Sequence, residues 1–265
     1  MTMIGTGTHN QFHRSGVAIL AAFLVFVSLS ASASDGESLL HSAGNDVADI
    51  ASLQRGARNF VNYCMGCHAA KYIRFNKLQA DLRLTDEQMR QNLMFSAKTT
   101  DELMEIAMPP ADAERWFGQI PPDLTLIARS RGTDWVYSFL KSFYLDDYAT
   151  TGTNNLLLPN ASMPHVLWEL QGLQEATFRA EEQDGILIEH FGEPYYFEEF
   201  EMVRQGEMSA EEYDQFVRDL VNFLDWAGSP EQLERQRLGI WVIAFLFVFL
   251  IFAYLLKVEI WKDVK

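Results

Sequence analysis

The sequence predicts a mainly α-helical protein with a single C-terminal transmembrane helix. Three observations lead to this fold class: helix-start motifs followed by apolar residues at helical spacing, a short apolar segment near the N-terminus, and a longer one near the C-terminus. The 265 residues suffice for one large domain or two small ones. The formal net charge of −15 argues against nucleic acid as a partner, because phosphate binding needs a basic face.

Residues 1–33 are typical of a secretory signal peptide. Arg14 supplies the basic region, and an apolar core of 13 residues runs from Val17 to Leu29. As a helix this core is about 20 Å long, which is too short for a hydrocarbon layer of about 30 Å. Ala31-Ser32-Ala33 fits a cleavage site with small residues. We therefore expect cleavage; the alternative is an uncleaved membrane anchor.

The segment from Leu238 to Leu256 has 19 residues and no charge. As a helix it measures about 28 Å and nearly spans a bilayer core. Trp241 and Tyr254 lie near its ends, where aromatic side chains favour the membrane interface. Its length and apolarity disfavour the alternative, a buried core helix. The predicted order is a signal peptide, an exported domain, a transmembrane helix and a cytoplasmic tail, at residues 1–33, 34–232, 238–256 and 257–265.

The strongest chemical motif is the run from Cys64 through Cys67 to His68, the C-x-x-C-H attachment signature of c-type haem. Each thiol can form a thioether to a vinyl group, and the adjacent His68 can then bind the iron as its proximal ligand. The sequence holds 2 cysteines, so the motif predicts one covalently bound haem c. Three alternatives are weaker. A structural zinc site needs four nitrogen or sulfur ligands, a thioredoxin-like pair needs a βαβ context, and a disulfide here would close a very small loop.

A helix is expected directly before this motif. Leu53, Ala57, Phe60 and Cys64 recur at the spacing of one helix face. Such a helix would deliver the cysteines to the macrocycle. An ordinary core helix would give the same pattern and is compatible with this interpretation.

The sixth iron ligand is open on spacing alone. Met/His ligation suits electron transfer, whereas an open sixth position suits gas binding or catalysis. Met108 and Met163 each precede a proline in a loop, a stiff setting that could hold a sulfur at iron. Either could instead be a packed surface-loop methionine. Met89, Met94 and Met104 lie in helix-like stretches and are expected in the core.

Capping boxes mark two further helices. One opens at Thr85 with Gln88, and the other opens at Ser209 with Glu212 and ends at Gly228. Between these helices, apolar runs at 186–188 and 195–197 predict two short strands.

Three more helices follow from proline, glycine and polar start signals. The first follows Pro121-Pro122-Asp123 and ends near Arg131-Gly132. The second is capped by Thr133 or Asp134. It is expected to carry on one face the aromatic residues Trp135, Phe139 and Phe143. The third begins at Pro164 and stops at Gly172.

Negative charge is concentrated in residues 181–214, which hold twelve acids against the single base Arg204. Such a stretch could steer a basic partner onto this face. It could equally be a solvated face that keeps the protein soluble.

Several motifs in this order resemble the cytochrome c1 family in its bacterial form, from about residue 36 to the C-terminus. The C-x-x-C-H part is shared by all c-type cytochromes, whereas the Pro-Pro-Asp-Leu stretch, the Met-Pro loop and the tail helix are specific together. Thr125 stands where the family often has serine and keeps the hydroxyl. The stretches that carry the resemblance are Asn62–His68, Trp116–Gly118, Pro121–Thr125, Asn160–His165 and Phe223–Ala227.

The resemblance implies a class I cytochrome c-like haem domain with loop insertions. It selects Met163 over Met108 as the sixth ligand, so that His68 and Met163 would bind the iron. Alternatively, Arg131 could only stabilise the C-terminus of its helix through a favourable interaction with the helix dipole. The other implied contacts are Arg131 with a haem propionate, Trp135 near the haem and Pro122 against the porphyrin face.

The function implied by the resemblance is membrane-anchored, mono-haem electron transfer within a quinol–cytochrome c reductase of the bacterial inner membrane. The chain would take an electron from the Rieske iron–sulfur protein and pass it to a c-type cytochrome, with its haem domain in the periplasm and the quinol chemistry on other subunits. Cytochrome b and a second copy of the complex are the other implied partners. Two alternatives are a tethered cytochrome c that serves another oxidase or dehydrogenase, and a haem enzyme with an open sixth position.

Overall fold

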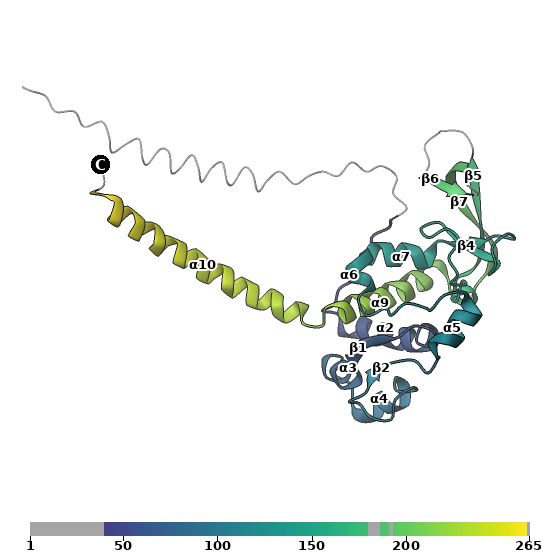
Figure 1. The fold of residues 1–265 in the computed structure, drawn as a ribbon, viewed down its shortest axis with the longest axis horizontal. Helices are drawn as coiled ribbons and strands as arrows, with labels where there is room; N and C mark the ends of the chain where they lie inside the picture. The colour runs from purple at the N-terminus through teal and green to yellow at the C-terminus, as the bar shows by residue number, and fades with distance from the viewer. Residues whose placement is uncertain (1–39, 180–185, 191–192, 264–265) are drawn as a thin grey trace, which may run out of the picture. The chain divides into compact units, whose positions relative to one another are not determined.

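The structure is a computed structural model that describes residues 40–179, 186–190 and 193–263 (Figure 1). The expected signal peptide lies outside these residues. Helices dominate the described part, which confirms the mainly α class. They are α2 (Ile50–Tyr63), α3 (Phe75–Asp81), α4 (Asp86–Asn92), α5 (Pro110–Phe117), α6 (Ile127–Arg131), α7 (Thr133–Lys141), α8 (Trp168–Gln171), α9 (Ala210–Gly228) and α10 (Gln232–Trp261).

The strands form small antiparallel sheets. β1 pairs with β2, β3 pairs with β4, and a three-stranded sheet has the order β5-β7-β6. The two strands expected from the sequence lie in β6 and β7, whereas β5 was not predicted. The strands are β1 (Ala70–Arg74), β2 (Leu103–Met104), β3 (Phe143–Leu145), β4 (Thr153–Asn155), β5 (Gly172–Arg179), β6 (Ile186–His190) and β7 (Glu193–Gln205).

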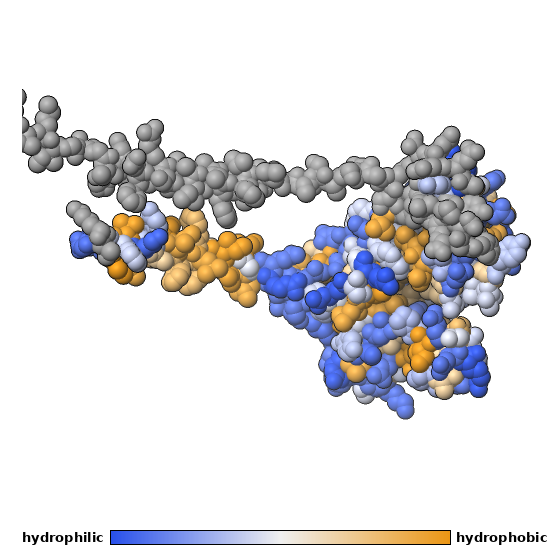
Figure 2. All heavy atoms as spheres, turned by 45° about the horizontal axis from the view of Figure 1, so that its top comes forward, coloured by the Kyte–Doolittle hydropathy of each residue, from blue (hydrophilic) through white to orange (hydrophobic). Residues whose placement is uncertain are grey.

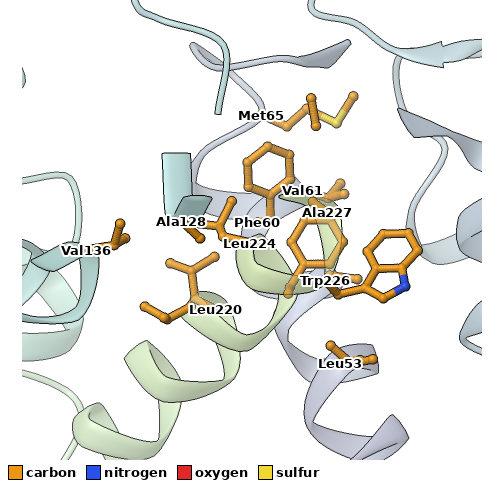
Figure 3. Packing of buried hydrophobic residues seen from close by; sticks show 14 of the residues in the cluster. Leu53, Phe60, Val61, Met65, Ala128, Val136, Leu220, Leu224, Trp226 and Ala227 are labelled. Atoms are coloured by element: carbon orange, nitrogen blue, oxygen red, sulfur yellow. The ribbon is translucent and has the colours of Figure 1, made fainter. Parts of the chain in front are cut away.

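The core is built on the crossing of α2 and α9. A Cβ atom at Gly56 would lie 2.0 Å from the backbone oxygen of Asp219, so only glycine allows this approach. One turn further along α2, the Phe60 ring lies 5.2 Å from the Phe223 ring, centroid to centroid. Figure 3 shows side chains of both helices in one cluster, which confirms the apolar face predicted for α2.

A buried charge joins the same two helices. The Asp219 carboxylate is 2% exposed and accepts a hydrogen bond from Ser52 Oγ at 2.7 Å. Arg55 Nε donates to its other oxygen at 2.6 Å. Because the carboxylate is paired and hydrogen-bonded, its burial is tolerated and the register of α2 on α9 is fixed.

Both predicted capping boxes are present. Thr85 and Gln88 close the start of α4, and Ser209 and Glu212 close the start of α9. Each pair satisfies backbone N–H groups that a helix start leaves free.

The expected caps of α7 are wrong. Its N-cap is Gly132, and no side chain caps it. The Asp134 carboxylate instead accepts a hydrogen bond from the backbone N–H of Ala43 at 2.8 Å, a distant partner in the sequence. Phe143 lies beyond this helix, in β3, although its ring still packs on Phe139 at 5.1 Å.

The helix expected from Pro164 to Gly172 is largely replaced by a loop. Only α8, at residues 168–171, is helical, and before it the N–H of His165 donates to Thr153 Oγ1. Gly172 has φ +99°, a conformation that favours glycine, and there the chain passes from α8 into β5.

The transmembrane prediction is confirmed by α10. This helix contains the expected segment 238–256, and its apolar side chains are exposed rather than buried in the domain. Figure 2 shows them as a continuous apolar surface. Among the described residues, α10 is the one helix long and apolar enough to cross a membrane, so it anchors the protein there.

Candidate haem site

The attachment motif forms a tight turn at the end of α2. Cys64 is the C-cap of this helix, and its N–H donates to the Phe60 carbonyl at 2.9 Å. The N–H groups of Cys67 and His68 both donate back to the Cys64 carbonyl, at 3.0 and 2.8 Å. Both thiols are free and half-buried. The helix predicted before the motif therefore delivers both cysteines to one place.

The imidazole of His68 is held in one tautomer. Its Nδ1 lies 2.7 Å from the Pro122 carbonyl oxygen. Because a carbonyl only accepts hydrogen bonds, Nδ1 carries the proton and Nε2 keeps its lone pair. Burial lowers the pKa of His68, partly offset by the Pro122 carbonyl and the Asp123 charge. A neutral imidazole with a free Nε2 is the form that binds iron.

The segment that begins with Pro121 and Pro122 is clamped to the chain after His68. The N–H of Leu124 donates to the Ala69 carbonyl at 2.9 Å, and the Asp123 carboxylate accepts from the N–H of Lys71 at 2.8 Å. Asp123 is a residue that the sequence analysis did not assign to the site. Asp123 follows two prolines, and such a sequence is a recognisable turn signal. In the structure its carboxylate accepts a hydrogen bond from the N–H of Thr125.

The competing interpretations of the cysteines lose support. Burial raises the pKa of the Cys64 thiol to about 12, whereas a thioredoxin-like pair needs a readily formed thiolate. Among the described residues, no three His, Cys, Asp or Glu side chains gather closely enough to hold a metal ion, which disfavours a zinc site.

Arg131 and Trp135 lie together at the junction of α6 and α7. The guanidinium carbon of Arg131 is 5.1 Å from the Trp135 ring centroid, and Arg131 is exposed. The Trp135 ring stacks on Phe139 with centroids 5.1 Å apart and planes 9° apart. The exposed cation is therefore oriented by an aromatic side chain that is itself held by packing.

Met163 is half-buried and packs on the hydrophobic core that contains Phe60 and Phe223. Cys64 and Trp135 pack on the same core. Met163 therefore shares a core with the attachment motif. Met108 is half-buried as well and lies just before Pro109, the N-cap of α5. The methionines expected in the core are all buried: Met89, Met94 and Met104.

The loop that carries Met163 ends at a buried histidine. His165 is 5% exposed and its ring stacks on Phe143, with centroids 5.0 Å and planes 3° apart. Burial lowers the pKa of His165 to about 4, an effect that the Gly172 carbonyl and the Gln171 side chain partly offset. The imidazole is thus neutral and serves as a packed aromatic group.

These residues fit a c-type haem. Two half-buried thiols lie in one turn, the neighbouring imidazole has its Nε2 lone pair free, and a thioether packs on the same core. The exposed guanidinium of Arg131 suits a carboxylate such as a propionate.

The described part of the acidic stretch forms ion pairs with bases that lie outside it. Asp214 is paired with both Lys141 and Arg218. Arg179 is paired with Glu198, so this carboxylate is partly neutralised. Glu199 and Glu201 are exposed on β7. The side chains of residues 181–195 lie outside those that the structure describes.

Comparison with known proteins gives close relatives over nearly the whole chain. The pattern of the Cytochrome C1 family matches residues 41–264. Cytochrome c1 of Allochromatium vinosum is 49% identical over 246 residues, which cover 93% of this chain and 98% of that protein. The ammonia monooxygenase gamma subunit of Nitrosomonas europaea is 41% identical over 248 residues, or 94% and 98%. Mitochondrial cytochrome c1 of Schizosaccharomyces pombe is 27% identical, over 82% of this chain and 68% of that protein.

Proposed function

This chain belongs to the cytochrome c1 family, and from that premise we propose that it accepts one electron from a Rieske iron–sulfur protein and donates it to a c-type cytochrome. Membership makes it a haem-containing electron carrier of the cytochrome bc1 complex. Cytochrome b and a second copy of the complex are its other proposed partners. Quinol is oxidised on other subunits, so the chain itself has no catalytic residue.

The single observation that supports this proposal best is the hydrogen bond from His68 Nδ1 to the Pro122 carbonyl, at 2.7 Å. It holds the imidazole so that Nε2 can bind iron, beside two thiols that can attach one haem covalently. When bound, the haem supplies a one-electron ferric/ferrous couple. The protein's part is to hold this couple, set its potential and exclude water.

In the proposed site, Cys64 and Cys67 would hold the haem through thioethers, and His68 and Met163 would bind its iron. Arg131, Trp135 and Pro122 would complete its surroundings, and the Arg131 guanidinium would pair with a propionate. Methionine as the second ligand raises the reduction potential, which suits an acceptor of electrons from an iron–sulfur protein.

The proposed topology puts residues 34–232 in the periplasm, after removal of residues 1–33. The span 238–256 crosses the inner membrane and residues 257–265 lie in the cytoplasm. A reporter that is active only in the cytoplasm, fused after Lys265, should be active. The same reporter fused after Gln232, with the membrane helix deleted, should be silent, and the reverse pattern would contradict this orientation.

The function is tested by purification of the intact assembly from membranes. Haem stain should remain on the chain under denaturing electrophoresis, and its mass should include one haem adduct. The co-purifying subunits should include a b-type haem protein and an iron–sulfur protein. Recovery with oxygenase subunits instead, which the name of the Nitrosomonas europaea relative suggests, would refute the proposal.

The axial ligand is tested by Met163→Leu, with Met108→Leu as the matched control. Leucine keeps the volume of methionine, so the packing should change by less than ~1.5 kcal/mol. Met163→Leu should remove the sulfur-to-iron charge-transfer band of the oxidised protein and admit carbon monoxide to the reduced haem. Met108→Leu should leave both unchanged, and the opposite pattern would reassign the ligand.

A further inference from the structure

Strand β4 is polar and buried at every position. Thr153, Asn154 and Asn155 are 8%, 3% and 0% exposed. Consecutive asparagines are rare in strands, and buried amides must be hydrogen-bonded. The partners of these three side chains therefore indicate what the strand does.

All three side chains accept hydrogen bonds from the loop that carries Met163. Asn155 Oδ1 accepts from the N–H groups of residues 157 and 158, at 2.9 and 3.2 Å. Asn154 Oδ1 accepts from the N–H of residue 160 at 2.8 Å. Thr153 Oγ1 accepts from the N–H of residue 165 at 3.3 Å. The bonds therefore bracket Met163 on both sides.

The strand itself is fixed to the core. Asn155 Nδ2 donates to the Phe139 carbonyl at 2.8 Å, at the end of α7. Asn155 also pairs with Phe143 across the β3–β4 ladder. The buried position and the ladder make β4 a rigid reference for the loop.

The far end of the loop is fixed to the same ladder by packing. The His165 ring stacks on Phe143, the residue opposite Asn155. One rigid hairpin thus holds the loop before Met163 through Asn155 and after it through Thr153 and Phe143.

We propose that β4 positions the Met163 sulfur, with Asn155 and Thr153 as positioning residues that act through the loop backbone. This inference rests on the proposed function, in which Met163 is an axial ligand. Without these acceptors, the buried N–H of residue 165 and the partly buried N–H groups of residues 157 and 158 lose their partners, and the loop rearranges to satisfy them. The thioether would then be held less firmly, and the potential that methionine raises would fall.

The test uses the full-length chain, loaded with haem, in detergent. Asn155→Ala removes two acceptor bonds to the loop. Thr153→Val removes the acceptor for residue 165 with little change of shape, and Thr153→Ser restores the hydroxyl. The control is Asn222→Ala, since Asn222 is 0% exposed and donates to the Asp46 carbonyl at 2.7 Å and to Ser52 Oγ at 2.9 Å, on the α2–α9 side.

The readouts are the charge-transfer band, the midpoint potential and carbon monoxide binding to the reduced haem. Asn155→Ala and Thr153→Val should weaken the band, admit carbon monoxide and shift the redox equilibrium at least about tenfold toward ferric, which is ~59 mV for one electron. Thr153→Ser and Asn222→Ala should keep the parent values, although Asn222→Ala lowers thermal stability.

Parent values in both Asn155→Ala and Thr153→Val would overturn the inference. So would an equal shift in Asn222→Ala, because destabilisation alone would then explain it. If Asn155→Ala does not fold, the Thr153 pair decides. Met163→Leu in the same assay distinguishes the ligand assignment of Met163 from the positioning role of β4. A band that survives Met163→Leu refutes the ligand assignment, whereas a band lost there but kept in the β4 variants refutes only the role of β4.

Discussion

Gly56→Ala should destabilise the haem domain, because α2 and α9 touch at this residue. The added Cβ would lie 2.0 Å from the Asp219 backbone oxygen and 2.8 Å from Phe223 Cβ. Since close carbon–oxygen contacts are usually at least ~3.3 Å, the helices must separate locally by about 1.3 Å. Backbone cannot move aside as a side chain does, so the cost should reach the upper end of overpacking, ~3 kcal/mol. Alanine returns ~1 kcal/mol through helix propensity. The net loss should be about 2 kcal/mol.

Thermal unfolding of the full-length chain, followed by far-ultraviolet circular dichroism, measures this loss. A domain of this size should lose ~4–8 °C in Tm for 2 kcal/mol. Gly239→Ala is the control, because a Cβ there meets nothing within 4 Å. Its Tm should equal that of the parent or rise slightly, because Gly239 lies in α10 and alanine gains the same helix propensity there without a clash. An unchanged or higher Tm in Gly56→Ala would refute the close approach of the two helices.

Three further predictions concern the cap of α9, an acidic group and the acidic face. Ser209→Ala breaks the capping box and should cost about 1 kcal/mol in denaturant unfolding, whereas Ser209→Asp should keep most of the stability. Burial raises the pKa of Asp214, but hydrogen bonds from Lys141 and Tyr137 outweigh it and hold this pKa below its usual range. Its stabilisation is present at neutral pH and is lost as the pH falls through that lowered pKa. The deficit of Asp214→Asn in urea unfolding should therefore shrink as the pH falls below the ordinary range of an aspartate. Joint Glu199→Gln and Glu201→Gln substitution should slow electron delivery to a basic acceptor at low salt and change little at high salt, and a salt-independent parent rate would contradict docking.

Local sequence signals predicted the elements that depend on neighbours in the chain. The capping boxes at Thr85 and Ser209 and the apolar helix α10 need no distant partner, and they formed as expected. The cap expected at Asp134 failed, because its carboxylate bonds to the N–H of Ala43, a contact that only the tertiary fold creates. The helix expected from Pro164 is also largely absent, and the loop in its place makes a distant contact, the bond from the His165 N–H to Thr153 Oγ1.

The candidate site divides along the same line. The C-x-x-C-H motif is local chemistry and was recognisable from the sequence. The hydrogen bond from His68 to the Pro122 carbonyl joins residues far apart in the chain, and a proline in the sequence predicts ring packing rather than a carbonyl acceptor. Asparagine is common in turns, so the sequence around Asn154 and Asn155 does not indicate that both are buried.

We therefore expect stability and redox tuning to be separable in this protein. The contact between α2 and α9 depends on close packing at Gly56 and Phe223 and on the buried charge of Asp219. Among the described residues, none of these three residues shares a hydrogen bond with the Pro122 segment or the Met163 loop. Those two segments are instead held by individual side-chain and carbonyl acceptors. Variants more than about 7–10 Å apart with no shared partner should combine additively. A double variant of Gly56→Ala and Thr153→Val should thus show the Tm loss of the first and the potential shift of the second. If the midpoint potential shifts further in the double variant than in Thr153→Val alone, the crossing of α2 and α9 also influences the position of the Met163 loop.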